Sequence, residues 1–296
     1  MPLFFLLSGY TKYALAGKPE IPFKVYVKKL FLSMMIPDYC FELLNGILWC
    51  GQQLLHGQPL PTAEGWRSIF LLADLGEYGG MGNKFWFLPC MFVSSILFYW
   101  ILHFTKKRES QVGVILALLL LSWGTGRVLP SRLPLQLDVA MMATAFMVIG
   151  YLGGEFLREC LENRNWLSDV VLIALSVFFV WFSHQKGAYL RMFENQFGNY
   201  PYVLLAALFG AFAFVLICKY LFLLLQRLPA ADLFVRWCGI NSMGVYLVHL
   251  EVLAVIRALC PNLPWFGWFL LTILFTVPAV NYISAYLPIC FGKIKK

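Results

Sequence analysis

The sequence has few charged residues. Asp, Glu, Lys and Arg make up 13% of its 296 residues, whereas a soluble domain holds about 25%. Hydrophobic residues make up 60%, and the mean hydropathy is +0.73. A soluble domain cannot bury that much apolar surface, so this class is excluded. The formal net charge of +8 then indicates the basic rim of a membrane protein rather than a nucleic-acid-binding face.

The sequence also lacks the cysteine patterns of metal and redox sites. None of its eight cysteines forms a CxxC pair, and no histidine lies at metal-ligand spacing from a cysteine. We therefore expect no metal. Internal repeats, low-complexity tracts and linkers between domains are missing too, so we predict one domain over residues 1–296.

Long apolar runs are what the sequence has in excess. Eight of the nine runs reach or approach the ~20 residues that a helix needs to cross a bilayer core. Helices are expected because an open strand leaves backbone groups unpaired in lipid. The predicted fold class is an all-α integral membrane protein, a polytopic bundle of about nine transmembrane helices. The runs cover residues 1–16, 30–51, 85–104, 111–128, 135–157, 166–183, 201–226, 237–258 and 265–287.

Lys and Arg residues are concentrated in every second gap between the runs. Sixteen of the 23 lie in one set of gaps and seven in the other. The positive-inside rule assigns the richer set to the cytoplasm, which also places the C-terminus there. Segments 52–83 and 184–200 are then external. We expect segment 52–83 to form a loop, a short interfacial helix near 66–75 and a second loop.

An odd number of spans would place Met1 on the outer side of the membrane. The simplest remedy is a further helix before Met1 that runs from inside to outside. The alternative is that residues 1–16 insert as a short hairpin or an interfacial segment.

Four stretches carry information beyond hydropathy. They are MPLFFLLSGY at 1–10, FKVYVKKL at 23–30 with Ile36-Pro37 after it, NKFWFLP at 83–89 and GINSMGVYLVH at 239–249. In this order and spacing they resemble the membrane-bound acyltransferase-3 family, and within it the sugar O-acetyltransferase branch of fucose 4-O-acetylase-like proteins. The resemblance spans nearly the whole chain. Its motif residues are Ser8, Gly9, Trp86, Asn241 and Ser242, of which Ser8-Gly9 is expected to let another helix approach closely.

The resemblance implies a ten-helix fold in a bacterial inner membrane, with the first helix missing from these residues. It also implies acetyl transfer from cytoplasmic acetyl-CoA, the acyl donor, to a hydroxyl of a glycan or glycan precursor. The family's first helix carries a basic residue and a His proposed to be catalytic, and neither occurs here. No acid follows Trp86-Phe-Leu-Pro89, and Pro37-Asp38-Tyr39 stands where the family usually has Pro-Tyr. We therefore expect no O-acetyl transfer from these 296 residues, and activity from a version extended upstream by about 40 residues.

Two acidic residues lie inside an apolar run. Asp38 and Glu42 are four residues apart and share a helix face. At ~1.5 Å per residue they lie about 12 and 18 Å from the cytoplasmic end of the run. A structural role would have them bonded to Asn45, to a tyrosine hydroxyl or to each other through a shared proton. A catalytic role would use them for proton transfer in a polar pocket.

His249 is the candidate base near the membrane midplane. A buried histidine in a helix is often a satisfied core residue, and that alternative stays open. A catalytic role is favoured because Ser8, Asn241, Ser242 and the acidic pair are also expected in the interior, where polar groups gather in one cavity. Glu251 follows two residues later and should point to a different face.

Basic residues at the predicted cytoplasmic mouth are candidates for coenzyme A binding. They are Lys24, Lys28, Lys29 and Arg236. Lys28 and Lys29 are expected to precede a helix, whose N-terminus favours phosphate. The alternative is that they set the topology and contact anionic membrane lipid.

Three functions remain open at this point. The preferred one is a membrane-bound O-acetyltransferase with a glycan or sugar acceptor. A proton-coupled transporter or lipid-linked glycan flippase would also place carboxylates at the midplane. The third is an inactive member of the family.

Overall fold

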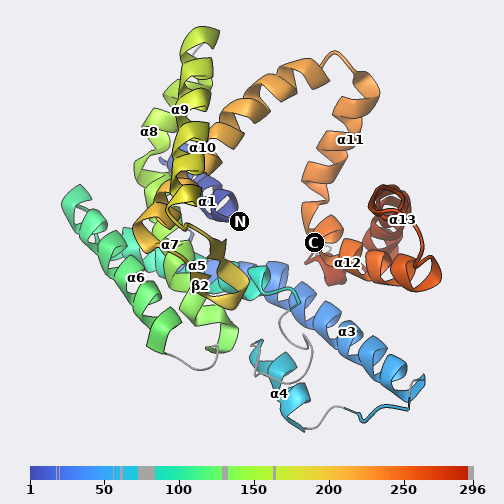
Figure 1. Ribbon diagram of the computed structural model, residues 1–296. Helices are drawn as coiled ribbons and strands as arrows, with labels where there is room; N and C mark the ends of the chain where they lie inside the picture. The colour runs from blue at the N-terminus through green and yellow to red at the C-terminus, as the bar shows by residue number, and fades with distance from the viewer. Residues whose placement is uncertain are drawn as a thin grey trace. The chain divides into compact units, whose positions relative to one another are not determined.

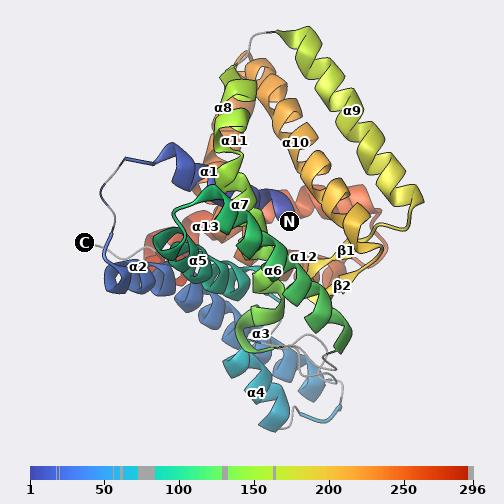
Figure 2. The ribbon, with the colours of Figure 1, turned by 90° about the vertical axis from the view of Figure 1, so that its left-hand side faces the viewer.

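A computed structural model describes the protein at residues 1–17, 19, 21–55, 57–60, 63–72, 84–128, 133–162 and 165–292 (Figures 1 and 2). The chain divides into two compact units. Unit 1 contains Met1–Ile21 and Cys90–Leu228, and unit 2 contains Pro22–Pro89 and Pro229–Lys296. The two units are described separately below.

Seven helices within the described ranges are long and apolar enough to cross a membrane. This finding confirms the predicted class, an all-α polytopic membrane protein, while the number of nine spans stays a prediction. The first predicted run forms helix α1, Pro2–Ala14, which has 13 residues. The second forms α3, Ile36–Leu55, which is not among the seven.

Unit 1 is built from long helices and one small hairpin. Strands β1, Leu190–Arg191, and β2, Gln196–Phe197, pair antiparallel between α9 and α10, which lie side by side in both views. The other elements of the unit are α1, most of α5 (Phe87–Phe104), α6 (Arg108–Val128), a 3-10 turn (Pro134–Gln136), α7 (Leu137–Leu152), α8 (Gly154–Glu162), α9 (Trp166–Gln185), a 3-10 turn (Met192–Glu194) and α10 (Tyr200–Leu225).

Helix α7 forms the centre of unit 1, because most of its side chains are buried. Helix α1 packs against it through two glycines. A Cβ atom on Gly9 would lie 1.9 Å from the carbonyl oxygen of Met147, and one on Gly150 would lie 2.0 Å from that of Leu6. Only a residue without a side chain permits such an approach. The close contact expected at Ser8-Gly9 is therefore confirmed.

Unit 2 begins with a helical stretch that changes its winding. Helix α2 (Phe23–Leu30) continues through a π-helical turn (Phe31–Met35) into α3. The turn precedes Pro37, which has no N–H and disturbs the regular ladder. The short helix expected near 66–75 is present as α4, Ala63–Leu71, and the loop predicted after it, including 73–83, lies outside the described residues.

The predicted helix over 237–258 is in fact two helices. Helix α11 covers Pro229–Ile240, α12 covers Ser242–Leu259, and Asn241 lies between them with φ −105° and ψ 20°. Asn241 Nδ2 donates to the carbonyl oxygen of Trp237 at 3.1 Å. Glycine and asparagine weaken a helix, since asparagine competes for backbone hydrogen bonds. The Gly239-Ile-Asn241 sequence therefore explains the break.

The core of unit 2 gathers side chains from distant parts of the chain around α12. Helix α12 contacts both α3 and α13, Trp265–Tyr286, and a 3-10 turn, Pro288–Phe291, closes the unit. The core residues are all apolar and nearly inaccessible to solvent. They are Phe41, Phe85, Leu88, Leu247, Val248, Val280 and Phe291.

Candidate functional site

A cavity of about 650 Å³ in unit 2 is lined by α11, α12 and α13. Its size is that of a small-molecule site. Most of its wall is aromatic or aliphatic, with Trp237, Trp265 and Trp268 among the lining residues. Its charged and polar lining residues are Ser242, Tyr246, His249, Arg257, Thr272 and Thr276. We call it the His249 cavity.

His249 is held in one orientation by its own helix. Its Nδ1 lies 2.8 Å from the carbonyl oxygen of Val245. A carbonyl oxygen only accepts, so Nδ1 carries a proton and donates it. In the neutral ring the lone pair is then on Nε2. This arrangement is that of a general base whose tautomer is set by the backbone.

Thr276 on α13 contributes a buried hydroxyl to the same cavity. A Cβ atom on Gly244 would lie 2.9 Å from Val280 Cγ1, which sets the register of the antiparallel helices α12 and α13. Because the helices are antiparallel, each residue forward along α12 matches one residue back along α13. His249 lies five residues after Gly244 and Thr276 four before Val280, so the two are level within one residue. Thr276 is 4% exposed, and its Oγ1 has no hydrogen-bond partner among the described residues. An unpaired buried hydroxyl is unfavourable, and such groups are often found at functional sites.

The other polar motif residues only partly converge on this cavity. Ser242 lines it, whereas Asn241 lies at the break between α11 and α12 and donates a hydrogen bond to the carbonyl oxygen of Trp237. Ser8 lies in unit 1, where its Oγ donates to the carbonyl oxygen of Phe4 at 2.9 Å. Trp86 precedes α5 and packs edge-to-face on its neighbour, Phe87. Within unit 2, Asn241 is therefore not among the residues that line the cavity with Ser242 and His249.

The acidic pair is buried, but it does not line the His249 cavity. Asp38 and Glu42 are each 1% exposed. Glu42 Oε1 accepts a hydrogen bond from the backbone N–H of Phe85 at 3.0 Å. The Asp38 carboxylate has no hydrogen-bond partner in the described part of the chain. The burial on one face of α3 agrees with the helical spacing of the two acids.

A polar cluster that the sequence did not reveal joins α3 to α12. Lys84 forms an ion pair with Glu251 and donates to Asn45 Oδ1 at 3.1 Å. Asn45 thus accepts a hydrogen bond from Lys84 and does not bond to Asp38 or Glu42, as one of the structural alternatives had proposed. Glu251 faces this cluster while His249 faces the cavity, which confirms that the two residues point to different faces of α12.

The lysines proposed to bind coenzyme A do not precede a helix N-terminus. Lys24, Lys28 and Lys29 lie within α2, which begins at Phe23, and Lys28 and Lys29 are in its last turn. The expectation is wrong because the helix starts about two turns earlier than the apolar run, at Phe23. All three side chains are exposed.

Arg236 already has a partner on its own helix. Its Nε donates to Asp232 Oδ2 at 2.7 Å, one turn away on α11. This hydrogen bond and the negative charge of Asp232 raise the pKa of Arg236. Within the described residues, no group of three or more His, Cys, Asp or Glu side chains could hold a metal ion.

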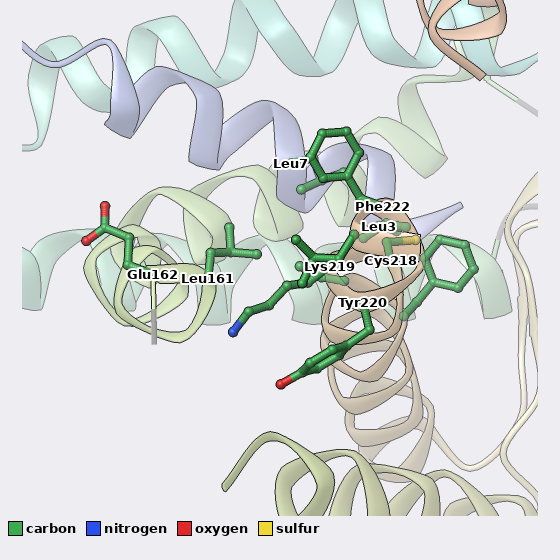
Figure 3. Close-up of a pocket in the computed structure, with 11 residues that line it drawn as sticks. Leu3, Leu7, Leu161, Glu162, Cys218, Lys219, Tyr220 and Phe222 are labelled. Atoms are coloured by element: carbon green, nitrogen blue, oxygen red, sulfur yellow. The ribbon is translucent and has the colours of Figure 1, made fainter. Parts of the chain in front are cut away.

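A second cavity, of about 840 Å³, lies in unit 1 between α1, α8 and α10 (Figure 3). Leu3 and Leu7 of α1 form part of its apolar wall, and Glu162, Lys219 and Tyr220 are its polar lining residues. We call it the Lys219 cavity.

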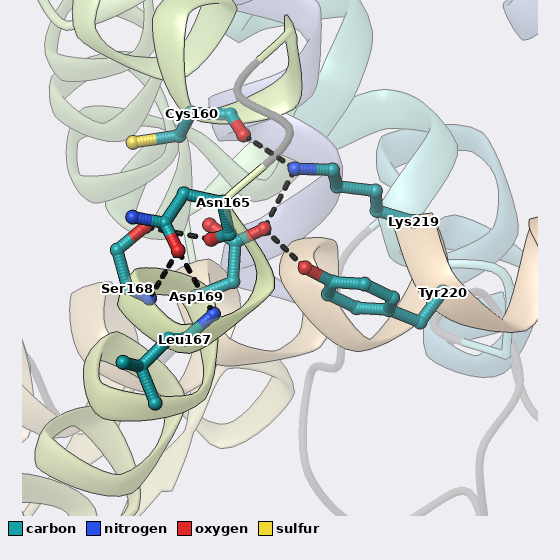
Figure 4. A network of polar contacts seen from close by, with 7 residues as sticks. All are labelled: Cys160, Asn165, Leu167, Ser168, Asp169, Lys219 and Tyr220. Carbon is teal, nitrogen blue, oxygen red and sulfur yellow. Dashed lines mark hydrogen bonds and ion pairs between the residues drawn. The ribbon is translucent and has the colours of Figure 1, made fainter.

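The Lys219 ammonium group is bonded within the protein (Figure 4). It donates to Asp169 Oδ2 at 2.7 Å and to the carbonyl oxygen of Cys160 at 2.9 Å. The Tyr220 hydroxyl donates to the same Asp169 oxygen. Asp169 is fully buried. Lys219 thus ties the end of α8 to α9 and α10, and we assign this network a structural role.

Three residues of the His249 cavity were not predicted from the sequence. Arg257 and Trp268 were counted only as a topological charge and an apolar residue, and Thr276 as part of a span. A charge and a hydroxyl inside apolar runs were the available signals. Their meeting on one wall depends on the register between α12 and α13.

Comparison with known proteins supports a family assignment. A family model described as "Acyltransferase domain" matches residues 1–283. No curated protein and no solved structure matches the chain.

Proposed function

The chain belongs to the acyltransferase-3 family, and we propose on that premise that it moves an acetyl group from cytoplasmic acetyl-CoA to a hydroxyl of a glycan or glycan precursor. It is a multi-pass membrane acyltransferase by family and by its spanning helices. We further propose a bacterial inner-membrane location with a cytoplasmic C-terminus, which the distribution of Lys and Arg supports. The upstream first helix likewise stays a prediction.

The observation that carries this proposal is the orientation of His249 on the wall of its cavity. With Nδ1 bonded to Val245, neutral Nε2 can take the proton of an acceptor hydroxyl. The hydroxyl oxygen then attacks the thioester carbonyl, the new C–O bond forms and the C–S bond breaks. The proton leaves Nε2 with the coenzyme A thiol. Apolar walls keep water from competing for the acetyl group.

The donor is proposed to bind at the basic residues of unit 2. Lys24 and Lys28 are one turn apart on α2 and share an exposed face, with Lys29 beside them. Such a face attracts the phosphates of coenzyme A without a helix N-terminus. Arg236 is the weaker candidate because Asp232 occupies its Nε. Anionic lipid is the alternative ligand for the same face.

Asp38 and Glu42 are proposed to support the reaction indirectly. They lie outside the lining of the His249 cavity, so they would act through other groups and are positioning residues. Their complete burial on α3 is the support for this role.

The direct test replaces His249 by Gln in the version extended upstream, which is the one expected to be active, and measures transfer from labelled acetyl-CoA to membrane glycan. We expect the rate to fall at least about a hundredfold, the usual contribution of a general base. His184→Gln is the matched control, since His184 lies at the end of α9 in unit 1. Transfer by His249→Gln at the control rate would show that another residue is the base.

A further inference from the structure

Arg257 presents an unused positive charge to the His249 cavity. Its side chain lines the cavity from the last turn of α12. Among the described residues it has no hydrogen bond and no ion pair. The side chain is exposed, so its charge is open to an anionic ligand from outside the protein.

The guanidinium group lies over an aromatic ring. Arg257 Cζ lies 5.0 Å from the centroid of the Trp268 ring. The indole is itself fixed, because Trp268 Nε1 donates to the carbonyl oxygen of Cys260 at 3.0 Å. The N–H edges of the guanidinium donate no hydrogen bond within the described residues and remain available to a ligand. Those edges form the planar fork that pairs with a carboxylate or a phosphate.

The spacing along α12 relates this charge to the candidate base. Eight residues separate His249 from Arg257, which is about two turns and about 12 Å. Both side chains therefore lie on the same face of the helix, and both line the same cavity. A molecule whose anionic group bonds to Arg257 would extend along the wall toward His249.

We propose that Arg257 binds an anionic group, a carboxylate or a phosphate, of the acyl acceptor, about 12 Å from the hydroxyl that reacts at His249. The acceptor is then an acidic glycan or a glycan carried on a phosphate. This inference rests on the proposed function, which identifies the bound molecule as the acyl acceptor. Recognition of the anion itself can be measured without any acetyl transfer.

The chain offers a matched control on another helix. Arg127 Cζ lies 4.5 Å from the centroid of the Trp123 ring. Both residues are on α6 in unit 1 and do not line the His249 cavity. Arg127→Gln thus removes the same kind of arginine–tryptophan contact outside the lining of the cavity.

The experiment measures binding to the purified protein without acetyl-CoA. One pair of probes is methyl glucuronide and methyl glucoside, which differ in a carboxylate. The other pair, presented in nanodiscs, is dioleoyl phosphatidate and dioleoylglycerol, which differ in a phosphate. For at least one pair we expect the wild-type preference for the anion to fall roughly ten- to a hundredfold in Arg257→Gln, as for a lost charged hydrogen bond. Arg257→Lys should keep part of it, and Arg127→Gln should keep it all.

Each outcome decides the proposal. Loss limited to the glucuronide supports an acidic soluble acceptor, and loss limited to the phosphatidate supports a phosphate-linked one. An Arg257→Gln variant with the wild-type preference in both pairs overturns it, and so does a wild-type protein without any preference. If thermal unfolding shows that Arg257→Gln is misfolded, the same binding measurements are made on Arg257→Lys. A preference of this variant for the anion that equals the wild-type preference and does not change at high salt then overturns the proposal. Failure of acetyl transfer would leave these binding results standing.

Discussion

The Lys219 cavity and the His249 cavity differ in whether their polar side chains have bonding partners within the protein. In unit 1, Lys219 is paired with Asp169 and with a backbone carbonyl oxygen. In unit 2, Arg257 lies over the Trp268 ring and has no ion pair among the described residues, where the hydroxyl of Thr276 also has no hydrogen-bond partner. A charge beside a cavity therefore indicates a ligand site only where the protein itself leaves that charge unpaired. On this ground we propose the His249 cavity as the functional one, although it is the smaller.

The largest effect is expected from breaking the Lys219 network. Lys219→Met leaves the buried Asp169 carboxylate without its cation, which should cost about 3–5 kcal/mol of the free energy of unfolding. The double variant Lys219→Met/Asp169→Leu should recover much of this loss. Unfolding monitored by circular dichroism measures both.

An exposed ion pair of unit 1 is the control for that experiment. Arg191 and Glu194 have side chains that are 62% and 30% exposed, so Arg191→Gln should change the free energy of unfolding by less than about 1 kcal/mol. Equal effects of Lys219→Met and Arg191→Gln would refute the structural role of the network.

A smaller effect is expected where α1 forms the wall of the Lys219 cavity. Gly9→Ala places a methyl group against the backbone of α7 and should cost about 1–3 kcal/mol by overpacking. Gly113→Ala on α6 has open space around its Cβ, and it should stabilise the helix by about 0.5–1 kcal/mol. Thermal unfolding of the two variants in parallel gives the sign of each change. The same sign for both would contradict the close approach of α1 and α7.

The smallest effect concerns the exposed lysines of unit 2. Replacing Lys24, Lys28 and Lys29 together by Gln should weaken acetyl-CoA binding about tenfold at low salt, since each exposed charge contributes at most about 1 kcal/mol. High salt should weaken wild-type binding similarly. Isothermal titration measures both, with Lys106→Gln/Lys107→Gln as the control. If neither the substitutions nor high salt changes the affinity for acetyl-CoA, these lysines only set the membrane topology.

Much of the architecture could be predicted from apolar length alone. The runs at 85–104, 111–128 and 166–183 correspond to α5, α6 and α9 within a few residues. Helix ends near polar residues were harder to predict. The helix of Lys28 begins at Phe23, and the run that contains His249 is interrupted at Asn241. In both places, local backbone bonding overrides the hydropathy pattern.

The site was predicted in part. His249 was identified as a candidate, and its cavity contains Ser242 from the same motif. The acidic pair was placed correctly on a buried face but not in that cavity, because the face of α12 that meets α3 carries Glu251 and apolar core residues instead of His249. Spacing within one helix shows which residues share a face, but it does not show which neighbouring helix that face meets.

The sequence by itself determined the helical membrane class and the close contact of α1. Lipid offers no partner to backbone groups, so each long apolar run must bond within itself, and a glycine beside an apolar stripe permits close packing whatever the rest of the fold. Only the tertiary structure decided that Lys84 meets Glu251, that Lys219 meets Asp169, and that Arg257 and His249 share a wall with Thr276. These partners are far apart in the chain or lie on different helices. Their meeting depends on the register and direction in which the helices pack, which local sequence does not encode.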